Sequence, residues 1–148
     1  MAVANNCELP EDLYYLVEKH VWARPVDGLV TVGITDVAQS LAKTLVAVTP
    51  REVGRRAAKG RSLATVESGK WVGPVPSPVA GEVVEVNHAV VQTPSTINRD
   101  PYGEGWILRL RPEDWQRDAA DLVTGPEGIE AYQRFLDAQG ITCAGPEG

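Results

Sequence analysis

The stretch from Thr65 to Val86, TVESGKWVGPVPSPVAGEVVEV, restricts the fold more than any other part of the chain. Short apolar or alternating runs at residues 62–68 and 81–87 are separated by glycines and prolines. Runs of this length between such residues are typical of strands, and they are too short for helices. The stretch therefore predicts β structure, with two strand segments flanking a hairpin tip at Gly69 and Lys70.

The predicted tip places a lysine where nothing shields it. A glycine at the first central position of a two-residue hairpin favours a type II′ turn, which needs a positive φ there. The chain has four lysines (19, 43, 59 and 70) against ten arginines, and only lysine offers a primary amine that can be acylated. From the residues alone, Lys70 is either a solvated charge at a loop tip or the site of a modification.

Strands and one short helix are predicted on the N-terminal side of this stretch. HVWARPVDGLVTVGIT indicates strand, turn and strand, because Asp27-Gly28 is a strong hairpin signal. TDVAQSLAKTL has near-helical spacing behind a capping residue, and it runs into a strand at about residues 45–48. Residues 10–18 begin with proline and acidic residues, which predicts a helical turn.

The pattern changes period near residue 112. GWILRLRP alternates, with Arg109 and Arg111 on one face of a strand and Leu108 and Leu110 on the other. Two helical segments follow, and the second runs from about Pro126 to residue 139 before a glycine stop. We therefore expect a single domain over residues 1–148 that is mainly β with peripheral helices. Its β core spans about 20–112 and its C-terminal helical segment about 113–140.

Charge, hydropathy and cysteine content exclude several classes of protein. The formal net charge of −6 argues against nucleic acid as a partner, and no apolar run is long enough to span a membrane. The first residues do not resemble a secretory signal. Cys7 and Cys143 are expected to be free surface thiols, which predicts a cytoplasmic protein, although a redox role for one of them stays open. The Cys and His spacings match no metal site.

The sequence gives no sign of a catalytic centre. It has no convincing Ser/His/Asp order and no glycine-rich phosphate loop. Glu82 and Glu85 lie three apart on a predicted strand, so they are expected on opposite faces rather than as an acid–base pair. We therefore predict no catalytic residues and no enzyme activity.

Four ordered motifs resemble one known family. Glu67, Ser68 and Lys70 match a Glu-Ser-x-Lys turn, and a Pro-x-x-Gly-Glu-x-x-Glu-x-Asn segment follows at residues 78–87. VGITDVAQ at 32–39 and INRDPYGEGWILRLRP at 97–112 supply the other two. Together they resemble the H-protein family of the glycine cleavage system, within the lipoyl/biotinyl-carrier fold, over about residues 14–136.

The resemblance implies a β-barrel sandwich with a lipoyl lysine at a hairpin tip and a C-terminal helix. Lipoic acid would be joined by an amide to Lys70, with Glu67, Ser68, Gly69 and Trp71 around it. A lysyl stem and an eight-carbon acyl chain together reach on the order of 10–15 Å. The implied protein is a monomeric carrier, modified by a lipoate ligase or lipoyl transferase, whose arm is a substrate for partner enzymes.

Two departures from the family pattern bear on the cargo. In the stretch KHVWAR, Val21 stands where the family commonly has a glutamate that holds the charged amine of the loaded arm. Trp71 follows the lipoyl lysine where small or polar residues are usual. It is either an apolar neighbour of the dithiolane or a cross-strand residue that stiffens the tip. His20 and Val21 are predicted to contact the cleft, and His20 and His88 are either contacts for an anionic cargo or structural histidines.

These departures resemble lipoate-binding proteins that serve heterodisulfide-reductase-like complexes in sulfur oxidation, and we expect this chain to carry a sulfur intermediate to such a complex. The first alternative is a glycine cleavage system H protein that carries an aminomethyl group between the decarboxylase and the aminomethyltransferase. The second is an unmodified interaction protein with the same fold. The motif glutamates and the net charge predict an acidic surface around the arm.

Overall fold

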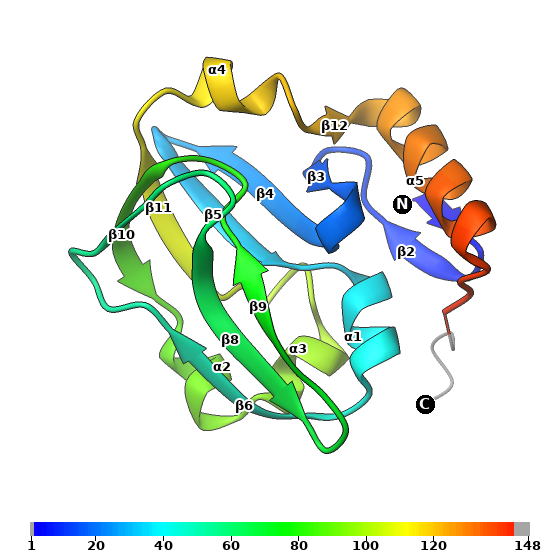
Figure 1. The fold of residues 1–148 in the computed structure, drawn as a ribbon, viewed down its shortest axis with the longest axis horizontal. Helices are drawn as coiled ribbons and strands as arrows, with labels where there is room; N and C mark the ends of the chain where they lie inside the picture. The colour runs from blue at the N-terminus through cyan, green and yellow to red at the C-terminus, as the bar shows by residue number, and fades with distance from the viewer. Residues whose placement is uncertain (1, 144–148) are drawn as a thin grey trace.

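The computed structural model describes residues 2–143, in which two antiparallel β-sheets pack face to face beside a C-terminal helix (Figure 1). The larger sheet has seven strands in the order β12-β3-β4-β5-β11-β10-β7. Their bounds are β3 Tyr14–Leu16, β4 Val21–Val26, β5 Leu29–Ile34, β7 Arg56–Ala57, β10 Gly81–Val86, β11 Leu108–Pro112 and β12 Val123–Thr124. This arrangement confirms the predicted fold class.

The smaller sheet carries the predicted lysine hairpin. It consists of β6 (Leu45–Pro50), β8 (Ser62–Ser68) and β9 (Val72–Pro76), in the order β6-β8-β9. Buried aliphatic side chains from both sheets form one core between them, among them Val32 and Leu110 from the larger sheet and Leu63 and Val75 from the smaller. The hairpin β8–β9 therefore rests on a packed layer, and only its end projects from the body (Figure 1).

The helices lie around the sheets. Their bounds are α1 Asp36–Ala42, α2 His88–Gln92, α3 Ser95–Arg99, α4 Trp115–Ala119 and α5 Gly125–Gln139, and a 3-10 turn, η1, spans Val17–Lys19. Two further strands, β1 (Ala2–Ala4) and β2 (Cys7–Leu9), form a separate hairpin. The helix α5 lies beside this hairpin (Figure 1).

Local sequence signals account for several of these elements. Asp27 and Gly28 both have positive φ, 54° and 80°, as a type I′ turn between β4 and β5 requires. Thr35 caps α1, because its side-chain oxygen accepts from the Ala38 N–H at 3.3 Å. Gly140 ends α5 in the left-handed conformation. The predicted hairpin, short helix and C-terminal helix are therefore confirmed.

Three expectations about local structure are wrong. Residues 14–16 form strand β3, and only Val17–Lys19 turn helically, because Tyr15 is fully buried and pairs with Trp22 of β4. The β structure is not confined to 20–112, since β1, β2, β3 and β12 lie outside that range. Glu82 and Glu85 do not face opposite sides, because a register shift between residues 83 and 85 restores both carboxylates to the outer face.

The two cysteines form a disulfide, which corrects the expectation of free surface thiols. Cys7 and Cys143 are 136 residues apart in sequence, and their sulfurs are bonded in a second apolar cluster beneath α5. Cys7 is fully buried and Cys143 nearly so. The bond ties β2 to the segment that follows α5. Because the two cysteines are bonded to each other, the argument from free thiols for a cytoplasmic location no longer holds.

None of the helices within residues 2–143 has the length and apolar character that crossing a bilayer would need.

Candidate functional site

The end of the β8–β9 hairpin places Lys70 in solvent. Glu67 of β8 pairs with Val72 of β9, and the Ser68 N–H donates to the Trp71 carbonyl at 2.7 Å. Gly69 and Lys70 are therefore the two residues at the tip, as predicted. Both are exposed, and within residues 2–143 no side chain forms an ion pair or hydrogen bond with the Lys70 amine. The amine is free to react.

The turn itself differs from the predicted type. Gly69 does not have a positive φ, so the tip is not a type II′ turn. The side chain of Ser68 supports the tip instead, because its oxygen accepts from the Lys70 N–H at 3.3 Å. Ser68 is 5 % exposed, so this contact lies at the base of the tip. Glu67 is exposed, and its carboxylate makes no hydrogen bond or ion pair with any of residues 2–143, so the turn rests on Ser68 rather than on Glu67.

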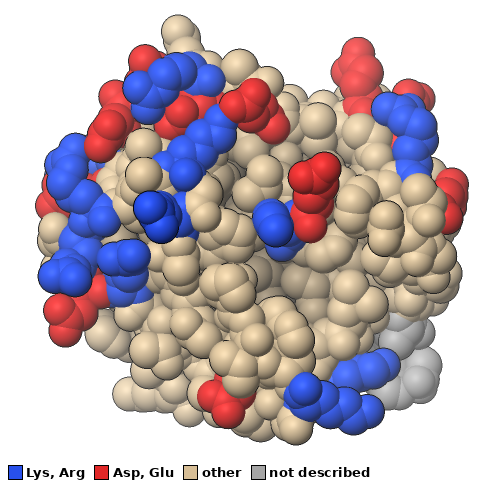
Figure 2. Space-filling model, viewed as in Figure 1, with Lys and Arg blue, Asp and Glu red and all other residues tan. Residues whose placement is uncertain are grey.

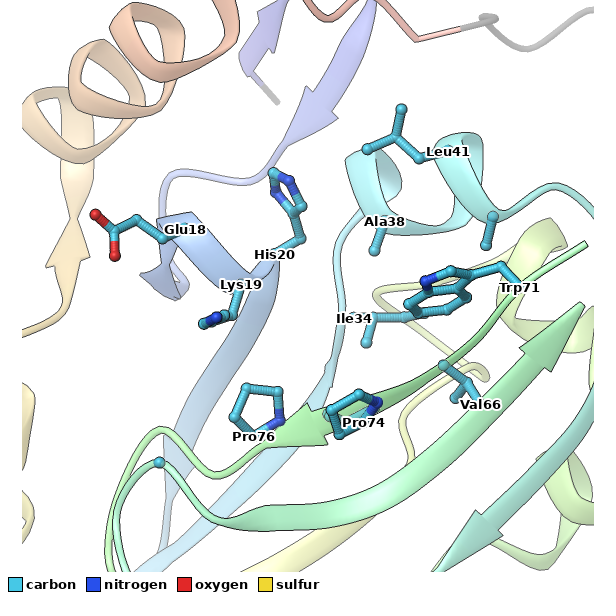
Figure 3. Close-up of a pocket in the computed structure, with 13 residues that line it drawn as sticks. Glu18, Lys19, His20, Ile34, Ala38, Leu41, Val66, Trp71, Pro74 and Pro76 are labelled. Atoms are coloured by element: carbon cyan, nitrogen blue, oxygen red, sulfur yellow. The ribbon is translucent and has the colours of Figure 1, made fainter. Parts of the chain in front are cut away.

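A groove of about 530 Å³ runs beside the hairpin, between β9 and α1 (Figure 3). One end and the floor are lined by apolar side chains, and the other end by the η1 turn. The lining residues are Glu18, Lys19, His20, Ile34, Ala38, Leu41, Ala42, Gly60, Val66, Trp71, Pro74, Val75 and Pro76. The volume falls within the usual range for sites that bury a small ligand. The groove begins at Trp71, one residue after Lys70.

Trp71 projects into the groove rather than across to the opposite strand (Figure 3). A Cβ built on Gly73 would lie 2.1 Å from Cζ2 of the indole, so the ring rests directly on the backbone two residues ahead. The indole is 47 % exposed. Of the two interpretations offered by the sequence, this placement favours an apolar neighbour of the arm over a cross-strand stiffener.

His20 lies at the opposite end of the groove, held by a network from α5. Its Nδ1 is 2.6 Å from the hydroxyl of Tyr132, which is itself 3.0 Å from the hydroxyl of Thr35. Burial lowers the pKa of His20 to about 4. The imidazole is therefore neutral near pH 7, and it acts as a structural histidine rather than as a cation for an anionic cargo. His88 is exposed at the start of α2 and does not line the groove.

The neutral His20 predicts acid sensitivity. In the unfolded chain His20 becomes protonated as the pH falls below ~6.5, whereas in the folded chain it stays neutral down to about pH 4. The free energy of unfolding therefore falls as the pH is lowered across that interval. Urea unfolding at pH 7.0, 5.5 and 4.5 measures the loss. His20→Gln should flatten the profile, whereas His88→Gln should retain the wild-type slope. Equal slopes in wild type and His20→Gln would contradict the assignment.

Val21 does not contact the groove, which corrects the predicted cleft contact. Its side chain is fully buried in the core between the sheets, and it is absent from the groove lining. Of the residues that line the groove, Glu18 is the one carboxylate. It lies on η1, two residues before His20, at the rim of the groove (Figure 3). The rim therefore carries one acidic residue, but Figure 3 shows its carboxylate pointing away from the groove.

The surface around the tip is mixed in charge rather than acidic as predicted, since the exposed Glu67 lies three residues before Lys70. Figure 2 shows basic side chains at the lower right, on the side where Figure 1 places the end of the β8–β9 hairpin and α1. Glu82 and Glu85 lie on β10 in the other sheet. Each pairs with an arginine of β11, at 3.5 Å from Arg111 and 2.7 Å from Arg109. These motif glutamates are neutralised and remote from the tip.

Several groove residues carried no signal in the sequence. Pro74 and Pro76 looked like strand breakers, yet both lie on β9 and line the groove. Glu18 looked like part of a helical turn before the first strand. Its position follows from His20, which adopts a left-handed conformation (φ 59°) at the end of η1 and reverses the chain. The sequence around Glu18 predicts a helical turn and gives no sign of this reversal.

Comparisons with known proteins agree on one family. The family model described as Glycine cleavage H-protein matches residues 13–136. The chain is 46 % identical over 147 residues to "Glycine cleavage system H protein 5" of Aquifex aeolicus, covering 97 % of this chain and 99 % of that one. It is 50 % identical over 134 residues to the "Glycine cleavage system H protein" of a strain of Thermus thermophilus, covering 89 % and 98 %.

A solved structure extends the agreement to the fold. The crystal structure of a glycine cleavage system H protein from Mycobacterium marinum superposes with a TM-score of 0.75 at 36 % identity, over 90 % of this chain and all of that one. Proteins of this family are lipoyl carriers rather than catalysts, and they bear lipoate on a lysine. The names of these relatives favour the glycine cleavage alternative, and none of them refers to sulfur oxidation. This chain belongs to the glycine cleavage H-protein family.

Proposed function

We propose that this protein is a lipoyl carrier of the glycine cleavage system, with lipoic acid joined by an amide to Lys70. The observation that supports the proposal most is the free, exposed amine of Lys70 at the end of a hairpin whose base is packed on the core. A modifying enzyme reaches this amine without unfolding the sheet. Lys19, Lys43 and Lys59 lie outside the Glu-Ser-x-Lys turn, and Lys59 pairs with Asp121.

The groove fits the group that the proposal requires. The dithiolane supplies a strained disulfide that opens readily and then holds cargo on sulfur. Beside Lys70 the chain offers an apolar floor, which includes Ile34, Val66 and Pro74, for the methylene chain and ring. The floor excludes water from one side of whatever lies on it. A length of about 10–15 Å from Lys70 corresponds to about three to five residues of extended chain, so it reaches Gly73 to Val75 of β9.

For the cargo we propose an aminomethyl group, passed between the decarboxylase and the aminomethyltransferase. Glu18 supports this choice, because rotation of its exposed side chain toward the groove would offer a carboxylate partner for an ammonium. The resemblance to carriers of a sulfur cargo was drawn from Val21, as a missing charge partner, and from Trp71. Since Val21 points into the core, it does not report on the cargo. No observation on the described part of this chain now favours a heterodisulfide-reductase-like complex.

An intact-mass spectrum tests the modification. Protein incubated with a lipoate ligase, ATP and lipoate should gain the mass of one lipoyl group, and peptide mapping should place it on Lys70. The same incubation without the ligase is the control. An unchanged mass under conditions that modify an authentic H protein would favour the alternative of an unmodified interaction protein.

The role of Glu18 predicts a modest effect on protection of the cargo. With the aminomethyl-loaded protein, Glu18→Gln should speed the loss of cargo to water about 1.4- to fivefold, since exposed ion pairs are worth about 0.2–1 kcal/mol. The decay of the loaded mass with time measures it. Glu11→Gln removes an exposed carboxylate that does not line the groove, and it should leave the rate unchanged. Equal effects of the two substitutions would remove Glu18 from the site.

A further inference from the structure

The groove beside Lys70 already contains a side chain of this protein. The indole of Trp71 enters it from the hairpin and lies over the floor near Ile34 and Pro74 (Figure 3). It is 47 % exposed, so roughly half of its surface is covered. A partly covered apolar side chain marks a place where a second apolar group could compete for the same cover.

Gly73 makes room for this indole. A Cβ on Gly73 would lie 2.1 Å from Cζ2 and 2.6 Å from Cη2 of the ring, far inside contact distance. Gly73 does not have a positive φ, so its backbone conformation is open to any residue. Gly73 therefore provides space for the indole, and it is not required there for its backbone conformation. Trp71 and Gly73 form a fitted pair at one side of the hairpin.

The lipoyl group proposed on Lys70 would start one residue away from this indole. Its reach covers the part of β9 along which Trp71 lies, and its methylene chain and ring need the same apolar floor. Both groups cannot lie on Gly73 at once. We propose that Trp71 and the lipoyl group are alternative occupants of this floor, so that Trp71 sets how much of the time the dithiolane is sheltered. This inference rests on lipoylation at Lys70.

The alkylation rate of the reduced arm tests the competition. Lipoylated protein is reduced and treated with N-ethylmaleimide, and the rate in the Lys70→Arg variant is subtracted as background. Trp71→Ala empties the floor, and Gly73→Ala fills the place of the indole and evicts it. Both should slow alkylation about three- to tenfold, because the arm then spends more time on an apolar surface. Unchanged or faster alkylation in both variants would overturn the inference.

Val72→Ala is the matched control. Val72 lies between the two tested positions, is 60 % exposed and does not line the groove. Its substitution should leave the alkylation rate at the wild-type value. Slowing in Val72→Ala equal to that in Trp71→Ala would also overturn the inference, since it would show that any loss of bulk at the hairpin suffices.

Fluorescence gives a readout that needs no activity. Acrylamide quenching of Trp71 is isolated by subtracting the Trp71→Ala spectrum, and it should increase in unmodified Gly73→Ala and in lipoylated wild type. The intact mass of each sample is recorded first. No lipoyl mass would refute the proposed function, and with it the arm that this inference requires. A lipoyl mass with unchanged quenching would refute the competition alone.

Discussion

Lys70→Arg should abolish the lipoyl mass gain, and with it all carrier activity. Arginine keeps the positive charge and a long stem, but its guanidinium does not form the amide that a primary amine forms. Lys70 is exposed at the hairpin tip and its amine contacts no partner within residues 2–143, so the free energy of unfolding should stay within about 0.5 kcal/mol of the wild type. Intact mass after ligase treatment and a urea unfolding curve measure the two effects.

Lys43→Arg is the control for this loss. Lys43 is also exposed and lies at the end of α1, near the same face, but outside the Glu-Ser-x-Lys turn. The variant should gain one lipoyl group as the wild type does. A full mass gain in Lys70→Arg would show that another lysine is the acceptor, and it would refute the assignment of the site.

Loss of the disulfide should destabilise the protein more than any surface substitution. Because Cys7 and Cys143 are 136 residues apart in sequence, the unfolded chain gains much conformational freedom when the bond is removed. The expected loss in the free energy of unfolding is about 3–5 kcal/mol. Urea unfolding of the wild type with and without reductant, and of the Cys7→Ala/Cys143→Ala double variant, measures it.

A thiol titration separates the bond from the packing of the cysteines. Unfolded, unreduced protein should show no reactive thiol, and reduction should release two. Two thiols before reduction would contradict the bond. In the double variant the methyl side chains remove little volume, so its stability should resemble that of the reduced wild type rather than that of the oxidised one.

The sequence predicted correctly those elements whose conformation is determined by residues close to them in the chain. The Asp27-Gly28 turn is set by two residues that tolerate positive φ, and α5 is delimited by its period and by Gly140. The position of Lys70 at a tip followed from the strand patterns on either side. The predicted turn type was wrong, but the predicted position of Lys70 was not affected, because the register of β8 and β9 fixes which two residues remain unpaired.

Features that depend on tertiary packing were not predictable in this way. The face of β4 that is buried is set by how the two sheets pack, so Val21 looked accessible although it lies in the core. The bulge in β10 reverses the side of Glu85, and a strict period of two cannot anticipate it. The cysteines meet only because α5 folds back over β1 and β2. The helices α2 and α3, each of five residues, are too short to show a period.

The most direct test of the account is glycine–bicarbonate exchange with a glycine decarboxylase. Lipoylated wild-type protein should support the exchange at a rate comparable to that of an authentic H protein, and the unlipoylated protein and Lys70→Arg should support none. A lipoylated protein that gives no exchange, beside an authentic H protein that does, would contradict the proposal that the arm on Lys70 carries an aminomethyl group.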